Sequence, residues 1–288
     1  MKAVFRHELS SYFTGVTGYV FGAFVLLFTG IYTMVYNLQS ASVNFEYVLG
    51  SMSFVFLIIV PIATMRILAE ERRQKTDQLL YSLPITMTQV VLGKFAALLV
   101  VFAAPLDIIC LYPLVLSAFG NVYLPASYSA IVSFFFLGMA LLSIGMYISS
   151  VTESQAVAAG LCFVVMLVNY FLGDLAGFAS STAYSSLAAL AVTTIVICIA
   201  VYWMTKNSFA SLILAAVLEA GLIGWYLVDS AKFEGLFPAI ISKLSLFERF
   251  YTIVNGVFDA TAIVYYLSIT GFFLFLSVQS LEKRRWSE

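Results

Sequence analysis

Long apolar runs dominate this sequence of 288 residues and constrain its fold more than any other feature. A helix needs about 20 apolar residues to cross the hydrocarbon core of a bilayer, which is about 30 Å thick. Runs of about this length lie at residues 16–36, 47–69, 90–119, 127–151, 155–173, 184–204, 208–228 and 260–281. The pattern predicts an all-α, polytopic integral membrane protein with about eight transmembrane helices.

Composition supports the same class. Apolar residues make up 62% of the chain and charged residues 10%. In soluble domains the averages are about 45 to 50% apolar and about 25% charged residues. The spans leave little sequence for a soluble domain, so we expect one transmembrane domain over residues 1–288. The net charge of -1 argues against nucleic-acid binding. Cys110, Cys162 and Cys198 stand alone in apolar runs, so no metal or redox site is expected.

The distribution of Lys and Arg orients the predicted spans. Eight crossings place both termini and residues 70–88 on one side of the membrane. Eleven of the 14 Lys and Arg residues fall on that side, and Lys232, Lys243 and Arg249 fall on the other. Cytoplasmic loops carry the excess of Lys and Arg. We therefore expect a multi-pass protein of the plasma membrane with both termini in the cytoplasm.

Two short segments outside the spans have helical patterns of their own. Phe5, Leu9 and Tyr12 recur at helical spacing, which predicts an amphipathic interfacial helix over residues 1–14. On the opposite side, the apolar residues from Phe237 to Phe247 predict a helical segment within 231–258. Asn255-Gly256 then indicates a turn, and Asp259 can cap the last span.

Residues 70–94, EERRQKTDQLLYSLPITMTQVVLGK, form the most hydrophilic stretch between two spans. Leu79, Leu80 and Leu83 share one helical face, while Glu71, Arg72, Lys75 and Gln78 can face water or a protein partner. Pro84 disfavours helix before it, and Thr86 with Gln89 matches a capping box. The simpler alternative is a solvated loop that only sets the topology. That alternative does not require the ordered leucines, the proline or the cap.

The motif E-E-R-x-x-x-T-x-x-L-L-x-x-L-P-I-T, followed by G-K, resembles the cytoplasmic coupling segment of ABC type 2 transporter permeases. The C-terminal stretch FERFYTIVNGVFDATAIVYYLSITGFFLFLSVQSLEKRRW is similar to the permeases of gliding-motility and nitrous-oxide-reductase-maturation ABC systems. The resemblance implies a coupling helix over residues 70–83 that docks in a groove of a separate ATPase. The residues it assigns to this role are Glu70, Glu71, Arg72, Thr76, Leu79, Leu80, Leu83 and Pro84.

The resemblance also implies an assembly and an energy source. Two permease subunits, identical or homologous, would bind two cytoplasmic ATPase subunits and export a substrate or act on an envelope process. A further membrane or extracytoplasmic subunit is a possible addition. The chain has no GxxxxGK[ST] phosphate loop, and its Gly93-Lys94 precedes Phe95. We therefore expect no enzyme activity and no cofactor in this chain, with ATP and Mg on the partner. Residues 184–228 depart from the family's six-span pattern as an inserted pair.

Carboxylates inside predicted spans supply a rival hypothesis. A charge in the bilayer centre costs about 2.5 to 3.5 kcal/mol on insertion scales, so Asp107 and Glu219 require compensation. They are either part of a substrate or proton path, together with Asn169 and Asp174, or neutral groups bonded across a helix interface. The first reading allows a proton- or ion-coupled carrier without an ATPase. An intramembrane enzyme is not expected, because His7 is the one histidine and GxSxG is absent.

Overall fold

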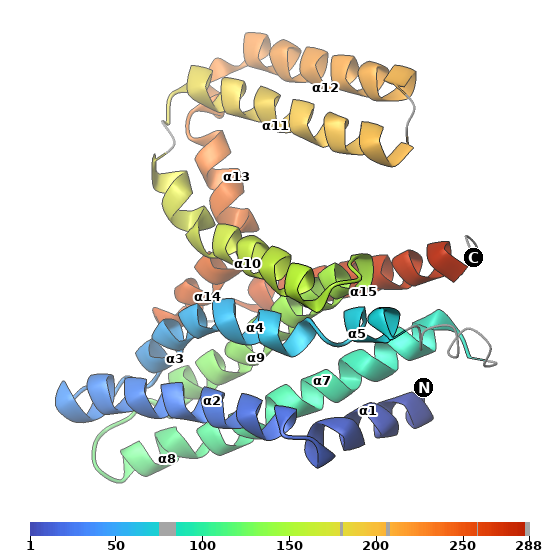
Figure 1. Cartoon of the computed structure of the whole chain (residues 1–288). Coiled ribbons are helices and arrows are strands. Elements are labelled where there is room, and N and C mark those ends of the chain that lie inside the picture. The colour runs from blue at the N-terminus through green and yellow to red at the C-terminus, as the bar shows by residue number, and fades with distance from the viewer. Residues whose placement is uncertain (75–84, 179–180, 206–207, 258, 286–288) are drawn as a thin grey trace. The chain divides into compact units, whose positions relative to one another are not determined.

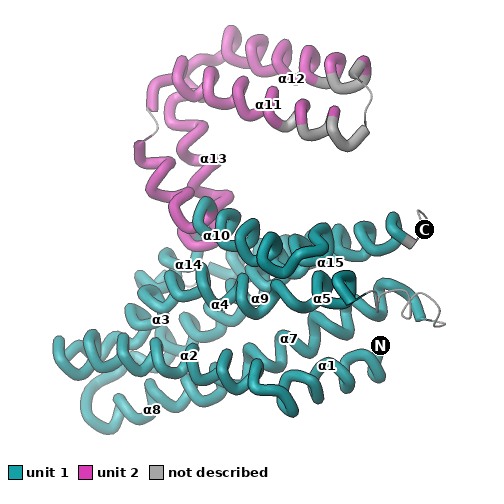
Figure 2. The backbone as a smooth tube through the Cα atoms, viewed as in Figure 1, with its two compact units in different colours: residues 1–168, 249–288 teal, residues 169–248 magenta. Residues whose placement is uncertain are grey.

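The computed structural model describes residues 1–74, 85–178, 181–205, 208–257 and 259–285, and within these ranges it contains helices and no β-strand. The chain divides into two compact units, which Figure 2 colours separately. Unit 1 comprises residues 1–168 and 249–288, and unit 2 comprises residues 169–248. The predicted all-α class is confirmed. The single domain over residues 1–288 stays a prediction.

Unit 1 contains the N-terminal helices and the C-terminal helix (Figure 1). In chain order its elements are α1 (Lys2–Thr14), α2 (Thr17–Thr33), η1 (Met34–Gln39), α3 (Glu46–Met52), η2 (Ser53–Val55), α4 (Phe56–Thr64), α5 (Ala69–Arg73), α7 (Met87–Ile109), α8 (Leu111–Ser117), α9 (Leu124–Val151) and α15 (Ala260–Arg285). The helices α10 (Gln155–Phe178) and α14 (Leu246–Val254) contribute to both units. Unit 2 adds α11 (Ala183–Thr205), α12 (Ser208–Val228), η3 (Ser230–Phe233) and α13 (Leu236–Leu244).

Within the described residues, six helical stretches are long and apolar enough to cross a membrane. They are Thr17–Gln39, Glu46–Arg73, Met87–Ser117, Leu124–Val151, Gln155–Phe178 and Ala260–Arg284. Each coincides with a predicted run, so six of the predicted runs are helices long and apolar enough to span a membrane. The described parts of α11 and α12 contribute shorter apolar stretches, Ala183–Val196 and Ala215–Val228. The count of eight spans therefore stays a prediction.

The core of unit 1 is built around α9, which packs against α3, α4, α7 and α15. The rings of Phe56 and Phe134 stack with centroids 4.5 Å apart, and Phe102 lies parallel to Phe135 at 6.0 Å. The absence of a side chain at Gly138 lets the Phe102 ring pack against α9, because a Cβ at residue 138 would lie 2.4 Å from that ring. In lipid, where apolar burial drives helix association only weakly, such close packing through small residues stabilises a helix bundle.

Three predicted local features are confirmed. Thr86 caps α7, since its hydroxyl accepts the Gln89 N–H at 3.3 Å. Asp259 caps α15 by accepting the Thr261 hydroxyl at 2.6 Å and its N–H at 2.8 Å, and these bonds lower the pKa of the Asp259 carboxyl. Gly256 takes the positive φ of 90° that the Asn255-Gly256 turn requires.

The helical segment predicted within 231–258 contains two helices, α13 and α14, with Ser245 between them. The Ser245 hydroxyl accepts the Glu248 N–H at 3.1 Å, which begins α14. The sequence S-L-F-E over 245–248 is itself a capping-box signal. Helical spacing alone predicted one helix because the apolar residues keep their period across the break.

Candidate functional site

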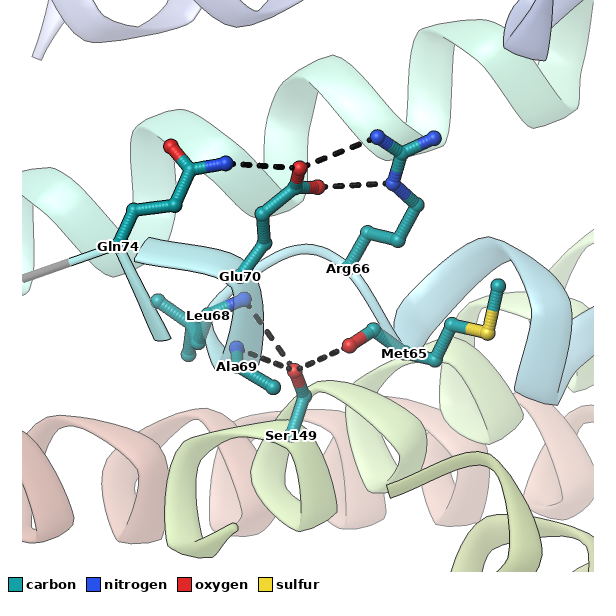
Figure 3. Close-up of polar contacts among 7 residues, drawn as sticks. All are labelled: Met65, Arg66, Leu68, Ala69, Glu70, Gln74 and Ser149. Carbon is teal, nitrogen blue, oxygen red and sulfur yellow. Dashed lines mark hydrogen bonds and ion pairs between the residues drawn. The ribbon is translucent and has the colours of Figure 1, made fainter. Parts of the chain in front are cut away.

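Of the predicted coupling helix over residues 70–83, the structure describes α5 (Ala69–Arg73) and Gln74. Ser149 of the neighbouring α9 caps the first turn of α5. The Ser149 hydroxyl accepts the N–H groups of Leu68 at 3.2 Å and Ala69 at 3.1 Å, and donates to the Met65 carbonyl at 3.4 Å (Figure 3). The first N–H groups of a helix need acceptors from outside the helix. One side chain of α9 thus supplies the cap of α5 and fixes the turn that leads into it.

One turn before Ser149, Gly145 brings α9 against the end of α4. A Cβ at Gly145 would lie 2.4 Å from Oγ1 of Thr64 and 2.9 Å from its Cβ. Thr64 cannot easily turn away, because its hydroxyl donates to the Val60 carbonyl at 2.8 Å and its side chain is branched at Cβ. The α4–α9 contact therefore requires glycine at residue 145.

Replacing Ser149 by alanine should free the start of α5. Loss of an N-terminal cap costs about 0.5 to 2 kcal/mol, and we expect faster hydrogen exchange at the amides of Leu68 and Ala69. Ser143→Ala is the matched control, since Ser143 is an equally buried serine of α9 whose hydroxyl donates within its own helix, to Ala140. Hydrogen exchange with mass spectrometry measures both variants. Equal exchange in both would contradict the cap.

Glu70 organises the exposed side of α5. Arg66 donates from Nε to Glu70 Oε2 at 2.8 Å and from Nη2 to Oε1 at 3.2 Å, and Gln74 donates to Oε1 at 3.1 Å (Figure 3). The Arg66 side chain is 48% exposed, so this pair adds less than about 1 kcal/mol to stability. Its effect is to order the side chains from residue 66 to residue 74.

Lys94 joins three helices of unit 1. Its Nζ donates to Oε1 of Glu8 in α1 and to Oε1 of Glu71 in α5, both at 2.6 Å. The Lys94 side chain is 3% exposed on α7. A buried ammonium is tolerated when opposite charges compensate its desolvation. Neither Lys94 nor Glu8 is predicted from the sequence as a site residue, although a lysine inside an apolar run indicates a nearby partner.

Close packing supports this ionic contact. A Cβ at Gly93, next to Lys94, would lie 3.1 Å from Cβ of Val4, which shows how closely α1 approaches α7. Residues Lys2–Thr14 form α1 within the predicted range 1–14, and its place in the membrane interface stays a prediction. The amphipathic pattern did not predict the role of Glu8 in this helix. Glu8 faces the protein and accepts a hydrogen bond from Lys94.

Arg72 corrects one expectation about the coupling segment. Its side chain was expected to face water or a partner, but the residue is 7% exposed and donates from Nη1 to the Thr152 carbonyl at 3.2 Å. Arg72 therefore links α5 to the end of α9. Arg73 and Gln74 are the exposed residues at the end of the described segment. The predicted coupling residues Thr76, Leu79, Leu80, Leu83 and Pro84 lie outside the described residues.

The C-terminal helix holds the same end of α9. Arg284 donates to Glu153 Oε1 and to the Val151 carbonyl, each at 3.2 Å, and Ser280 donates to the Ser150 carbonyl at 3.2 Å. The ends of α1, α5, α7, α9 and α15 thus converge at one end of unit 1. We call Glu8, Glu71, Arg72, Lys94 and Ser149 the coupling cluster.

Asp107, the first candidate for a substrate path, is exposed near the end of α7. The helix stops at Ile109 and α8 begins at Leu111. Pro113 lacks the N–H that would bond the Ile109 carbonyl, which explains the break. Tyr128 donates to the Cys110 carbonyl at 3.1 Å and satisfies part of the interrupted backbone.

The other three candidates belong to unit 2 and have separate surroundings. The Asn169 side chain accepts the Leu246 N–H at 3.2 Å and so helps to cap α14. Glu219 of α12 accepts a hydrogen bond from the Thr194 hydroxyl of α11. Asp174 is exposed on α10. Among the described residues, no hydrogen bond or ion pair joins Asn169, Asp174 and Glu219 to one another.

Comparison with known proteins gives a family. No curated protein matches the chain. A family model described as ABC-2 family transporter protein matches residues 8–194, well over half of the chain. The matched range begins at Glu8 and contains the whole coupling cluster. This chain therefore belongs to the ABC-2 transporter family and is a multi-pass membrane protein of that family.

Proposed function

We propose that this chain is the permease subunit of an ABC transporter in which a separate cytoplasmic ATPase drives substrate export. The coupling cluster is the observation that carries the proposal. Lys94 ties α5 to α1 and α7, and Ser149 with Arg72 ties α5 to α9. A force applied to the exposed end of α5 is therefore transmitted directly to three other helices.

The assembly we propose contains two permease subunits and two ATPase subunits, with ATP and Mg bound by the ATPases. Both termini and the coupling segment lie in the cytoplasm, α1 lies in the membrane interface, and α11 and α12 add an inserted pair to a six-span core. The C-terminal resemblance supports placement among the gliding-motility-type and nitrous-oxide-reductase-maturation-type permeases. The orientation is supported by the excess of Lys and Arg on the predicted cytoplasmic side.

Arg73 is a better residue than Arg72 for testing how the ATPase docks. Arg72 is buried and Glu71 is bonded to Lys94, so exchanging their charges would disturb the fold itself. Arg73 is exposed. We expect Arg73→Glu to weaken binding of the ATPase subunit while the chain still inserts and folds. Lys232→Glu reverses the charge of an exposed lysine on the predicted opposite side, and should leave binding unchanged.

The docking test is a pull-down of the ATPase subunit by the tagged chain from membranes that contain both. We expect reduced capture with Arg73→Glu and wild-type capture with Lys232→Glu. Equal capture by all three chains would remove Arg73 from the docking surface. Loss of capture with Lys232→Glu alone would reverse the proposed orientation.

A proton- or ion-coupled carrier is the second candidate, because Asp107 presents an exposed carboxylate beside a helix break in an apolar helix. Such a carrier would use Asp107 and Glu219. The two functions differ in their response to Asp107→Asn. The permease account expects ATP-driven transport to continue in this variant, with the same dependence on pH. Transport that needs no ATP and loses its pH dependence in Asp107→Asn would favour the carrier.

A further inference from the structure

Two adjoining cavities open on unit 1 between α1, α2, α4 and α7. The first has a volume of about 310 Å³ and an apolar wall that includes Val20, Phe21, Phe24, Ile59 and Leu98. The second has a volume of about 750 Å³ and a wall of mixed character, whose polar residues include His7, Glu8, Ser11, Glu71 and Lys94. Both volumes lie within the range of about 300 to 1,000 Å³ that is usual for ligand sites.

The two cavities form one groove because they share part of their walls. Tyr12, Thr17, Ile62, Ala63 and Arg66 line both. Val16 and Val20 are largely exposed at the apolar end, so the groove opens on the side of the helices there. The groove is thus apolar along the span α2 and polar beside α1 and α5. A ligand that fills it must be amphiphilic.

The charged residues at the polar end of the groove indicate which headgroup an amphiphilic ligand should carry. Glu8, Glu70 and Glu71 contribute three carboxylates, Arg66 and Lys94 contribute two cations, and Arg73 lies close enough to Glu70 to interact with it electrostatically. Lys94 is bonded to Glu8 and Glu71. The polar end therefore holds charges of both signs, which favours a headgroup with a positive and a negative group over one with only negative charge.

Arg66 lies where the apolar and polar cavities meet. Its Nε and Nη2 donate to Glu70, which leaves Nη1 without a hydrogen bond to a described residue, and the side chain is half exposed. A guanidinium is well suited to bind phosphate oxygens. Tyr12 adds a phenol hydroxyl that lines both cavities, and burial and the nearby Glu8 raise its pKa. The junction is thus suited to a phosphate group.

We propose that this groove binds one zwitterionic glycerophospholipid whose headgroup carries an ammonium group. One of its two acyl chains enters the apolar cavity, its phosphate lies at Arg66, and its ammonium group points toward the carboxylates of the polar cavity. A helix of a second copy would fill the apolar part but leave the charged part unmatched, at a cost in desolvation. The inference goes beyond the proposed transport function and holds whichever energy source drives the chain.

Two tryptophan variants test the groove. Ile62 lines both cavities and is 49% exposed, whereas Ile58 is 42% exposed one turn earlier on α4 and lines neither. We expect Ile62→Trp to fill the groove and weaken lipid binding at least about tenfold. Ile58→Trp should bind lipid as the wild type does. Arg66→Gln leaves the apolar cavity open and should weaken binding by removing the contact with phosphate.

The measurement is native mass spectrometry of the purified full chain, titrated in detergent with phosphatidylethanolamine or phosphatidylglycerol. We expect one tightly bound phosphatidylethanolamine per chain, bound about tenfold more tightly than phosphatidylglycerol. Similar binding of both lipids that Ile62→Trp does not change would mean unselective lipid around the helices and would overturn the proposal. A change of oligomeric state in Ile62→Trp with lipid binding intact would instead show an interface between copies, which also overturns it.

Discussion

Replacing Lys94 by methionine is expected to destabilise the helix bundle and to uncouple ATP hydrolysis from transport. Methionine keeps the apolar stem but removes the ammonium that Glu8 and Glu71 share. Breaking a buried ion pair by removing one partner costs about 3 to 5 kcal/mol. The Glu8 and Glu71 side chains are 19% and 24% exposed, so water partly solvates the carboxylates that are left unpaired. We therefore expect the free energy of unfolding to fall by about 2 to 4 kcal/mol.

Thermal unfolding in detergent measures the stability effect, and ATP-driven transport measures the coupling. Lys283→Met is the control, because Lys283 is an exposed lysine of α15. The triple variant Lys94→Met, Glu8→Gln, Glu71→Gln should recover much of the lost stability, since no uncompensated charge remains. It should not recover coupling, because the link between α5 and α7 is still missing. If the Lys94→Met variant unfolds at the wild-type temperature and transports at the wild-type rate, Lys94 neither stabilises the bundle nor couples α5 to α7.

Gly145→Ala is expected to separate α4 from α9 and to reduce stability by about 1 to 3 kcal/mol, the usual cost of overpacking a core. The new Cβ would lie 2.4, 2.8 and 2.9 Å from Oγ1, Cγ2 and Cβ of Thr64. Because Ser149 follows one turn later, the same displacement also strains the cap of α5. We therefore expect lower stability together with weaker coupling.

Gly160→Ala is the matched control for this prediction. Gly160 also lies inside a helix, α10, but a Cβ there would meet no atom within 4 Å. Alanine is favoured over glycine within a helix by about 0.5 to 1 kcal/mol, so this variant should be as stable as the wild type or more so. Thr64→Ala should partly rescue Gly145→Ala by removing the two nearest atoms. Equal melting temperatures for Gly145→Ala and Gly160→Ala would contradict the close contact.

The positions of the helices were predictable because local sequence determines them. Every long apolar run became helical, although residues 47–69 contain α3, η2 and α4, and residues 90–119 are divided between α7 and α8. Thr86 and Asp259 cap residues that lie within three positions of them. The coupling cluster was not predictable in the same way. Lys94 lies 86 residues from Glu8, and Ser149 lies 80 residues from Ala69. Hydrophobic periodicity carries no information on which distant helices pack together.

The prediction that the Arg72 side chain faces water was wrong for the same reason, because its partner is distant in the sequence. A run of charges next to a span predicts a solvated surface, and Arg73 and Gln74 follow that rule. Arg72 does not, because the folded bundle places the Thr152 carbonyl, 80 residues away, within hydrogen-bond distance. The desolvation cost of a charge inside a span indicated Asp107 and Glu219 as path residues, whereas Asn169 and Asp174 were predicted from their place near the outer end of the fifth predicted span. In the structure Glu219 accepts a hydrogen bond from Thr194, and Asn169 accepts the Leu246 N–H.

Purification of the tagged chain from its native membrane in mild detergent tests the central claim most directly. The account predicts that an ATP-hydrolysing subunit co-purifies in a stoichiometric ratio, and that Arg73→Glu reduces this ratio while Lys232→Glu does not. A chain that arrives without an ATPase, and that moves solute down a proton gradient in liposomes, would contradict the account and make Asp107 the residue to pursue.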